Sequence, residues 1–105
     1  MPQVLAAPAA TFRPDVLRYD EHVFVLRRRL EARAWQEDET WFVQCEELDL
    51  TVWGESREAA EEAFSFAFYA HYLNYYLADD SQLAPDALAY KSQLHDLIRV
   101  ALHLS

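Results

Sequence analysis

The segment CEELDLTVWGES, residues 45–56, gathers the side chains of this chain that could carry out chemistry. It contains the only cysteine and the only glycine among the 105 residues, together with four carboxylates. Such a set could supply metal ligands, a cysteine or serine nucleophile, or an acidic surface for a partner. The first two functions require a second group, a further ligand or a base, close to the first.

A metal site at Cys45 is not favoured by the pattern. Zinc is normally held by several cysteine or histidine ligands at close spacing, whereas the four histidines are scattered and form no HxxxH or HxxE pair. We therefore interpret Cys45 as a small buried apolar residue at the end of a strand. We expect no metal and no cofactor.

The sequence does not indicate catalysis either. Nothing in it places a base beside Cys45 or Ser56, and Ser56 suits the N-cap of a helix. Most carboxylates fall in predicted loops or at the start of a helix, where they are normally solvated. A single glycine cannot build a phosphate-binding loop. We expect a protein that is not an enzyme.

The net charge is concentrated in one segment. Ten carboxylates and a single base, Arg57, lie within residues 37–62, and this window accounts for the whole net charge of −9. An acidic surface repels nucleic acid and attracts a cationic partner, although solubility alone is another interpretation. The arginines at positions 27, 28, 29 and 33 divide between the faces of a predicted strand. We therefore expect no direct binding of nucleic acid.

Length and composition favour one folded domain. A chain of 105 residues, 52% of them apolar, can build a core. One cysteine excludes an internal disulfide and fits a reducing compartment. No basic region followed by an apolar core opens the sequence, and no apolar run reaches the ~20 residues of a membrane span. We expect a soluble, cytoplasmic protein.

Period-two patterns predict three consecutive strands after an N-terminal arm over residues 1–20. The first strand is long and covers residues 22–35, with a helix as the alternative because Leu, Arg, Ala and Glu favour helices. The second strand is TWFVQC, residues 40–45, and the third is LDLTVW, residues 48–53. Short loops between them, one of which is QEDET, predict an antiparallel meander.

Two helices are predicted after the meander. Gly54 allows a sharp turn into the first helix, which covers about residues 57–78, and the second helix covers roughly residues 86–103. The resulting fold class is α+β, a three-stranded antiparallel meander followed by two helices (β-β-β-α-α), in a single domain over residues 21–105.

The first predicted helix carries two apolar stripes, although packing on one sheet uses only one of them. The second stripe must meet either the C-terminal helix or a second subunit. We assign it to an oligomer interface, whose residues are Phe64, Phe68, Tyr72 and Tyr76.

The tract CEELDLTVWGESREAAEEA, residues 45–63, resembles the core motif of HicB-like proteins, the antitoxins of HicA–HicB systems. In that motif a strand with an aromatic residue near its start leads through a Cys-x-Glu-Leu-Asp-Leu turn to Gly-Glu-Ser/Thr-x-Glu-x-Ala, which opens a helix. The resemblance covers roughly residues 22–77. The matching residues are Trp41, Cys45, Glu47, Leu48, Asp49, Leu50, Gly54, Glu55, Ser56, Glu58 and Ala60.

The resemblance implies a partial ribonuclease H-like fold, in which a meander precedes a helix. It also implies an antitoxin function, in which the domain binds a small basic RNA-cleaving toxin and blocks it. A second helix stands where a fourth strand or a DNA-binding module would be expected in the family, so the expectation does not include operon repression. We expect complementary charge to hold the partner, and the predicted partner-binding residues are Glu46, Glu47, Asp49, Trp53 and Glu55.

The sequence leaves two other functions open. The main alternative is a stand-alone, homo-oligomeric, non-enzymatic HicB-like module, and it depends on the second apolar stripe. A ribonuclease would follow only from fold analogy, which is poor evidence for function. Its metal-binding carboxylates would have to lie on strands, whose predicted interiors carry almost none. We therefore rank it below the two binding functions.

Overall fold

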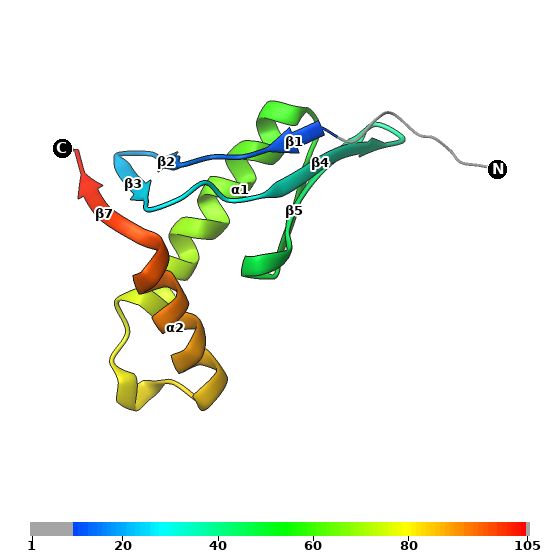
Figure 1. Ribbon diagram of the computed structural model, residues 1–105. Coiled ribbons are helices and arrows are strands. Elements are labelled where there is room, and N and C mark those ends of the chain that lie inside the picture. Colours follow the sequence, from blue (N-terminus) through cyan, green and yellow to red (C-terminus); the bar gives the residue numbers. More distant parts are fainter. Residues whose placement is uncertain (1–9, 105) are drawn as a thin grey trace. The chain divides into compact units, whose positions relative to one another are not determined.

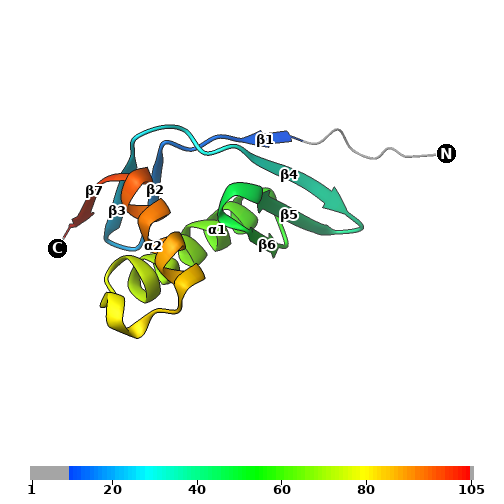
Figure 2. The same cartoon turned by 60° about the horizontal axis from the view of Figure 1, so that its bottom comes forward.

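The computed structural model describes residues 10–104, which divide into two compact units (Figures 1 and 2). Unit 1 contains the described residues up to Pro14 and residues 29–67, and unit 2 contains residues 15–28 and those from Phe68 onward. The described residues form seven strands in two antiparallel sheets, together with two α-helices. The fold class is therefore α+β, as the sequence predicts.

Unit 1 is built on a four-stranded sheet in the order β1-β4-β5-β6. The strands are β1 (Ala10–Phe12), β4 (Ala32–Glu37), β5 (Thr40–Cys45) and β6 (Leu50–Gly54). Strands β4, β5 and β6 follow one another in sequence and form a meander. Strand β1 comes from the segment interpreted as an arm and pairs with β4.

A two-residue turn between β4 and β5 determines the register of this meander. Its first residue, Asp38, has a left-handed backbone conformation with φ 57°, which aspartate tolerates better than most residues. The pairing that follows places Trp35 opposite Phe42, and Phe42 opposite Trp53. These three aromatic residues therefore occupy one row across the sheet.

The other face of this sheet is buried. Helix α1 (Arg57–His71) begins in unit 1, and its residues Ala60 and Phe64 have no exposed surface. The Phe64 ring meets Phe12 edge-on, with the two ring centroids 5.5 Å apart. Cys45 is also fully buried, which confirms its interpretation as a core residue. The other buried sheet residues are Ala32, Ala34, Val43 and Leu50.

Helix α1 begins where the sequence predicts. The backbone N–H of Ala59 donates a hydrogen bond of 3.0 Å to Oγ of Ser56, which makes Ser56 the N-cap. Gly54 does not have a positive φ, so its role differs from the expected backbone turn. A Cβ at this position would lie 2.7 Å from the backbone nitrogen of Ala60. Glycine is needed because β6 and the start of α1 approach too closely for a side chain.

Unit 2 contains a three-stranded sheet in the order β2-β3-β7. The strands are β2 (Val16–Tyr19), β3 (His22–Leu26) and β7 (Ile98–His103), and the helix is α2 (Pro85–Leu97). The last turn of α1 continues into a π-helical segment, Tyr72–Tyr76. The buried residues of this unit are Leu17, Phe24, Leu26, Phe68, Leu94, Leu97 and Ile98.

The single strand predicted over residues 22–35 is two strands in different sheets. Strand β3 belongs to unit 2 and β4 belongs to unit 1. Three consecutive exposed arginines, beginning at Arg27, lie between them. The prediction of one strand is wrong because a period-two pattern does not record where the chain leaves one sheet for another.

The second helix is shorter than predicted. It ends at Leu97, and the following six residues, IRVALH, form β7 instead of continuing the helix to residue 103. The β-branched residues Ile98 and Val100 favour a strand, and β7 pairs with all five residues of β3, with one register shift between Val25 and Leu26. The long-range pairing therefore overrides the helical pattern.

The assignment of one apolar stripe of α1 to an oligomer interface is wrong for two of its four residues. Phe64 and Phe68 are 0% and 1% exposed, so they are core residues of the chain and cannot contact a second copy. Within unit 2 the Phe68 ring meets Phe24 edge-on at a centroid distance of 5.2 Å. Tyr72 and Tyr76 are half-buried, and their rings stack at 4.8 Å.

The opposite stripe is the exposed one. Phe66 in α1 is 52% exposed, although the sequence alone offers no reason to prefer either stripe as the outer one. Both stripes contain large apolar residues, and only the packing decides between them. In the part of the chain that the structure describes, neither helix is long and apolar enough to cross a membrane.

Candidate protein-binding face

The predicted partner-binding residues lie on the segment between the end of β5 and the start of α1. Glu46 and Glu47 belong to a 3-10 turn, and Asp49 ends this turn with a left-handed backbone (φ 52°). Trp53 lies on β6 and is 65% exposed. Glu55 follows the strand. All of these side chains are exposed except Glu47, which is half-buried.

The structure does not bring these residues into a single cluster. A strand rises about 3.3 Å per residue, so Asp49 and Glu55 lie at opposite ends of β6, roughly 20 Å apart. Glu46 lines a polar pocket, whereas Trp53 lines an apolar groove. The predicted surface is therefore divided between two neighbouring features of unit 1.

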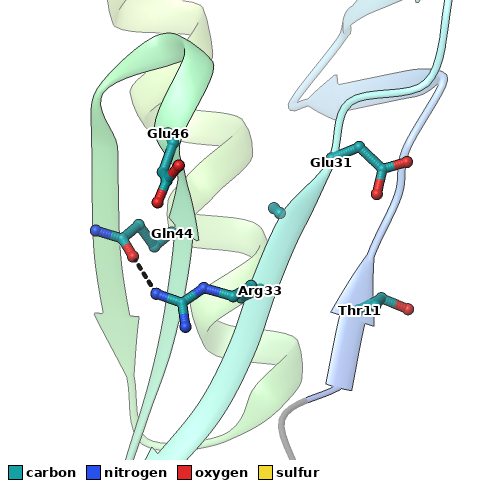
Figure 3. Close-up of a pocket in the computed structure, with 6 residues that line it drawn as sticks. Thr11, Glu31, Arg33, Gln44 and Glu46 are labelled. Carbon is teal, nitrogen blue, oxygen red and sulfur yellow. Dashed lines mark hydrogen bonds between the residues drawn. The ribbon is translucent and has the colours of Figure 1, made fainter.

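The polar pocket lies on the outer face of β4 and β5 and has a volume of about 240 Å³. Figure 3 shows the Arg33 side chain extending from β4 toward Gln44 on β5, and Nη2 of Arg33 donates a hydrogen bond of 2.7 Å to Oε1 of Gln44. Glu46 points toward this pair, whereas Glu31 points away. Glu31 forms an ion pair with Arg13, with Nε and Oε2 2.8 Å apart.

The pocket does not have the composition of a site for one ion. Its lining contributes one arginine and two carboxylates, so neither an anion nor a cation meets a uniform charge. Among residues 10–104 there is no group of three His, Cys, Asp or Glu side chains that could hold a metal ion.

Aromatic side chains cover the outer face beside the pocket. The Trp35 ring stacks on Phe42 with centroids 5.4 Å apart, and Nε1 of Trp35 donates a hydrogen bond of 2.7 Å to Oε2 of Glu37. The guanidinium carbon of Arg33 lies 5.3 Å from the Trp35 ring centroid, which is a cation–π distance. Trp53 continues the row on β6. Aromatic residues rimmed by charges are typical of protein-binding surfaces.

The aromatic row could not be assembled from the sequence alone. The alternation correctly places Phe42 on the opposite face from Trp41. Its alignment with Trp35, however, depends on the length of the turn between β4 and β5. A two-residue turn at Asp38 aligns the two rings, whereas the predicted five-residue loop leaves the register open. Recognising the aspartate as the left-handed residue of a tight turn would have revealed the row.

An apolar groove of about 380 Å³ follows the outer edge of β6. Consecutive residues of a strand point to opposite faces of its sheet. A groove lined by three consecutive residues therefore lies along the strand edge and not over one face. Helix α1 forms the other wall. The lining residues are Thr51, Val52, Trp53, Ala63, Phe66 and Ala67.

Unit 2 contains histidine–tyrosine pairs. Nδ1 of His71 lies 2.6 Å from the Tyr90 hydroxyl, and burial lowers the pKa of His71. The Tyr76 and His95 rings stack at 3.9 Å. Burial raises the pKa of Tyr72, with a further contribution from the charge of Tyr76. These contacts hold the π-helical segment against α2.

No family model, no curated protein and no solved structure matches this chain. The functional interpretation therefore depends on the residues of unit 1 and their geometry.

Proposed function

We propose that this protein is a HicB-like, antitoxin-type protein that binds and inhibits a small basic RNA-cleaving toxin through the acidic and aromatic side of unit 1. One observation carries the proposal. A tryptophan that is 65% exposed, Trp53, lies on β6 between the exposed carboxylates Asp49 and Glu55. Tryptophan is enriched in protein-binding hot spots, and the rim of a protein interface is polar.

The charge of this surface favours a basic partner. Arg57 is the single base of the acidic window, and its guanidinium is already engaged. Its Nε lies 2.8 Å from Oε2 of Glu61, and its Nη2 donates a hydrogen bond of 2.9 Å to the backbone oxygen of Thr11. It therefore does not neutralise the exposed carboxylates around β6. Complementary charge accelerates the association of two proteins and excludes partners of the same sign.

An RNA-cleaving partner fits the same chemistry. A protein that binds RNA requires a basic surface for the phosphates, and an acidic protein bound to that surface competes directly with the RNA. The order β4-β5-β6-α1 in unit 1 supports the proposal, because a meander followed by a helix is the arrangement that the HicB-like resemblance implies.

The test is affinity purification of the tagged chain from its native host, together with expression of the neighbouring gene product. We expect a small basic protein whose RNA cleavage is suppressed by an equimolar amount of this chain. A triple variant, Asp49→Lys, Trp53→Ala and Glu55→Lys, should lose the suppression. The matched control changes three exposed residues of unit 2, Asp79→Lys, Leu77→Ala and Asp86→Lys, and should retain it.

The proposal fails if no partner is captured, or if the partner is neither small nor basic. It also fails if both triple variants suppress RNA cleavage equally well, because the inhibitory surface would then lie outside the β6 region.

A stand-alone homo-oligomeric module is the second candidate, and one feature of unit 2 favours it. Leu73, Leu77 and Leu102 are 44%, 55% and 45% exposed and line the same pocket of about 180 Å³. A second copy of the chain would remove this apolar surface from water. Light scattering distinguishes the candidates, since a monomer at high concentration would leave the oligomeric module without support.

A further inference from the structure

We infer that the outer edge of β6 is a strand-addition site, on which an extended basic segment of the partner pairs with β6 as a fifth strand of the sheet. The inference rests on the proposed function because it takes the basic partner from there. It adds the way in which that partner is held.

Strand β6 has a strand on one side only. It is the terminal strand in the order β1-β4-β5-β6, and no strand within residues 10–104 pairs with its other edge. The N–H and C=O groups along such an edge are a template for a further strand. In strand addition, these main-chain groups supply affinity and adjacent pockets select the side chains.

The groove supplies such a pocket. Trp53 and Phe66 form its large walls and are both more than half exposed, at 65% and 52%. Ala63 and Ala67 also line it, and their small side chains leave room between helix and strand. Apolar side chains on one face of an added strand would enter this space. Side chains on the other face would extend the aromatic row of the sheet beyond Trp53.

The charges around the edge select a basic segment. Asp49 and Glu55 are exposed at the two ends of β6. Glu62 is exposed one helical turn before Phe66, a spacing at which side chains on a helix are neighbours. Carboxylates therefore surround the groove on both the strand side and the helix side. An added strand with alternating apolar and basic residues matches this pattern.

A second copy of the chain is a poorer occupant of the same edge. Antiparallel pairing of two β6 strands about Val52 places Asp49 of each copy beside Glu55 of the other. Like charges in opposed positions destabilise a strand pair, and this pairing creates two such contacts. We therefore assign the edge to a basic partner.

The experiment uses the full chain and a defined probe, the peptide acetyl-Lys-Val-Lys-Val-Lys-Val-Lys-amide. Its control is the same peptide with every internal amide nitrogen methylated, which keeps the charge and side chains but cannot donate main-chain hydrogen bonds. Binding is measured by titration, and hydrogen exchange is followed at the amides of residues 50–54. We expect the first peptide to slow exchange at these amides and to bind at least about tenfold more tightly than its control, equivalent to ~1.4 kcal/mol.

Two chain variants locate the site. Phe66→Ala removes one wall of the groove and should lower the affinity of the chain for the first peptide by about tenfold, or ~1.4 kcal/mol. Leu73→Ala removes an exposed apolar side chain from unit 2 and should leave the affinity unchanged. Equal affinity of both variants would place the peptide away from the groove and overturn the inference.

The remaining outcomes separate this inference from the proposed function. Strand addition is overturned if both peptides bind equally without slower exchange at residues 50–54, or if neither peptide binds. In either case, a captured basic partner still supports the antitoxin proposal. Slow exchange at these residues that depends on protein concentration alone identifies a second copy on the edge and also overturns the inference. Protection of β6 by the peptide in a chain that captures no basic partner supports strand addition and contradicts the antitoxin proposal.

Discussion

Nδ1 of His71 and the hydroxyl of Tyr90 lie 2.6 Å apart and connect the end of α1 to α2 within unit 2. Their rings also meet edge-on, with centroids 5.3 Å apart. A neutral imidazole with its proton on Nε2 accepts the hydrogen bond from the hydroxyl through Nδ1. Protonation removes this acceptor and places a charge in a half-buried position.

We predict that the free energy of unfolding decreases as the pH falls through 6.5, the ordinary pKa of histidine. Burial lowers the pKa of His71 in the folded chain, so the unfolded chain takes up the proton first. The contribution of His71 to stability is therefore complete above pH 6.5 and is lost below it. Urea unfolding of the chain and of His71→Gln, measured on both sides of this pH, checks the prediction. An identical pH dependence in both proteins would contradict it.

The Cys45 thiol should not react with a thiol reagent in the folded chain and should react fully in denaturant, because its side chain is 0% exposed. Cys45→Ser places a hydroxyl in the core and should lower the free energy of unfolding by about 1–3 kcal/mol. Time-resolved labelling and urea unfolding measure the two effects. Rapid labelling of the native protein would show that the end of β5 is accessible.

Gly54→Ala should lower the free energy of unfolding by about 1–3 kcal/mol, as other overpacking substitutions do. The added Cβ would lie 2.7 Å from the backbone nitrogen of Ala60 and 2.9 Å from the Cβ of Ala59. Thermal unfolding followed by circular dichroism measures the change. Ser92→Ala, at an exposed position of α2, is the control, and its free energy of unfolding should stay within about 0.5 kcal/mol of that of the unaltered chain. Equal stability of the two variants would mean that β6 and α1 separate easily.

The two apolar stripes of α1 should differ sharply in their response to truncation. Phe64→Ala removes a side chain that is 0% exposed and should cost about 3–5 kcal/mol. Phe66→Ala removes one that is 52% exposed, so its cost should be well below that of Phe64→Ala. Denaturant unfolding of both variants gives the comparison. If Phe66→Ala lowered the free energy of unfolding more than Phe64→Ala does, the assignment of the buried stripe would be reversed.

Local patterns in the sequence predicted much of unit 1. The residues of β5, Thr40–Cys45, coincide with the predicted strand, because its first four residues are all β-branched or aromatic. The N-cap at Ser56 was also predicted correctly. For the residues from Ile98 onward the sequence predicts a helix, because their strand state depends on pairing with β3, which is distant in sequence and leaves no local signal.

The candidate site shows the same limit. The exposure of Trp53 follows from its alternation with the core residues of β6. The groove beside it depends on which stripe of α1 faces the sheet, and both stripes contain phenylalanine. The alignment of Trp35 with Phe42 depends on a turn of two residues. These relationships arise from contacts between elements and cannot be deduced from one element at a time.

Neither unit is a continuous piece of the chain, since each is assembled from two separate stretches of sequence. In unit 2 the central strand β3 pairs with β2 on one edge and with β7 on the other, so its second edge can be paired only after β7 has been made. On the ribosome, β3 emerges before β7 and remains half-paired until the residues up to His103 have been made. Pairing between strands so far apart in sequence is slow and leaves intermediates open to aggregation. Until β7 is made, the unpaired edge of residues 22–26 is a template for pairing with other chains.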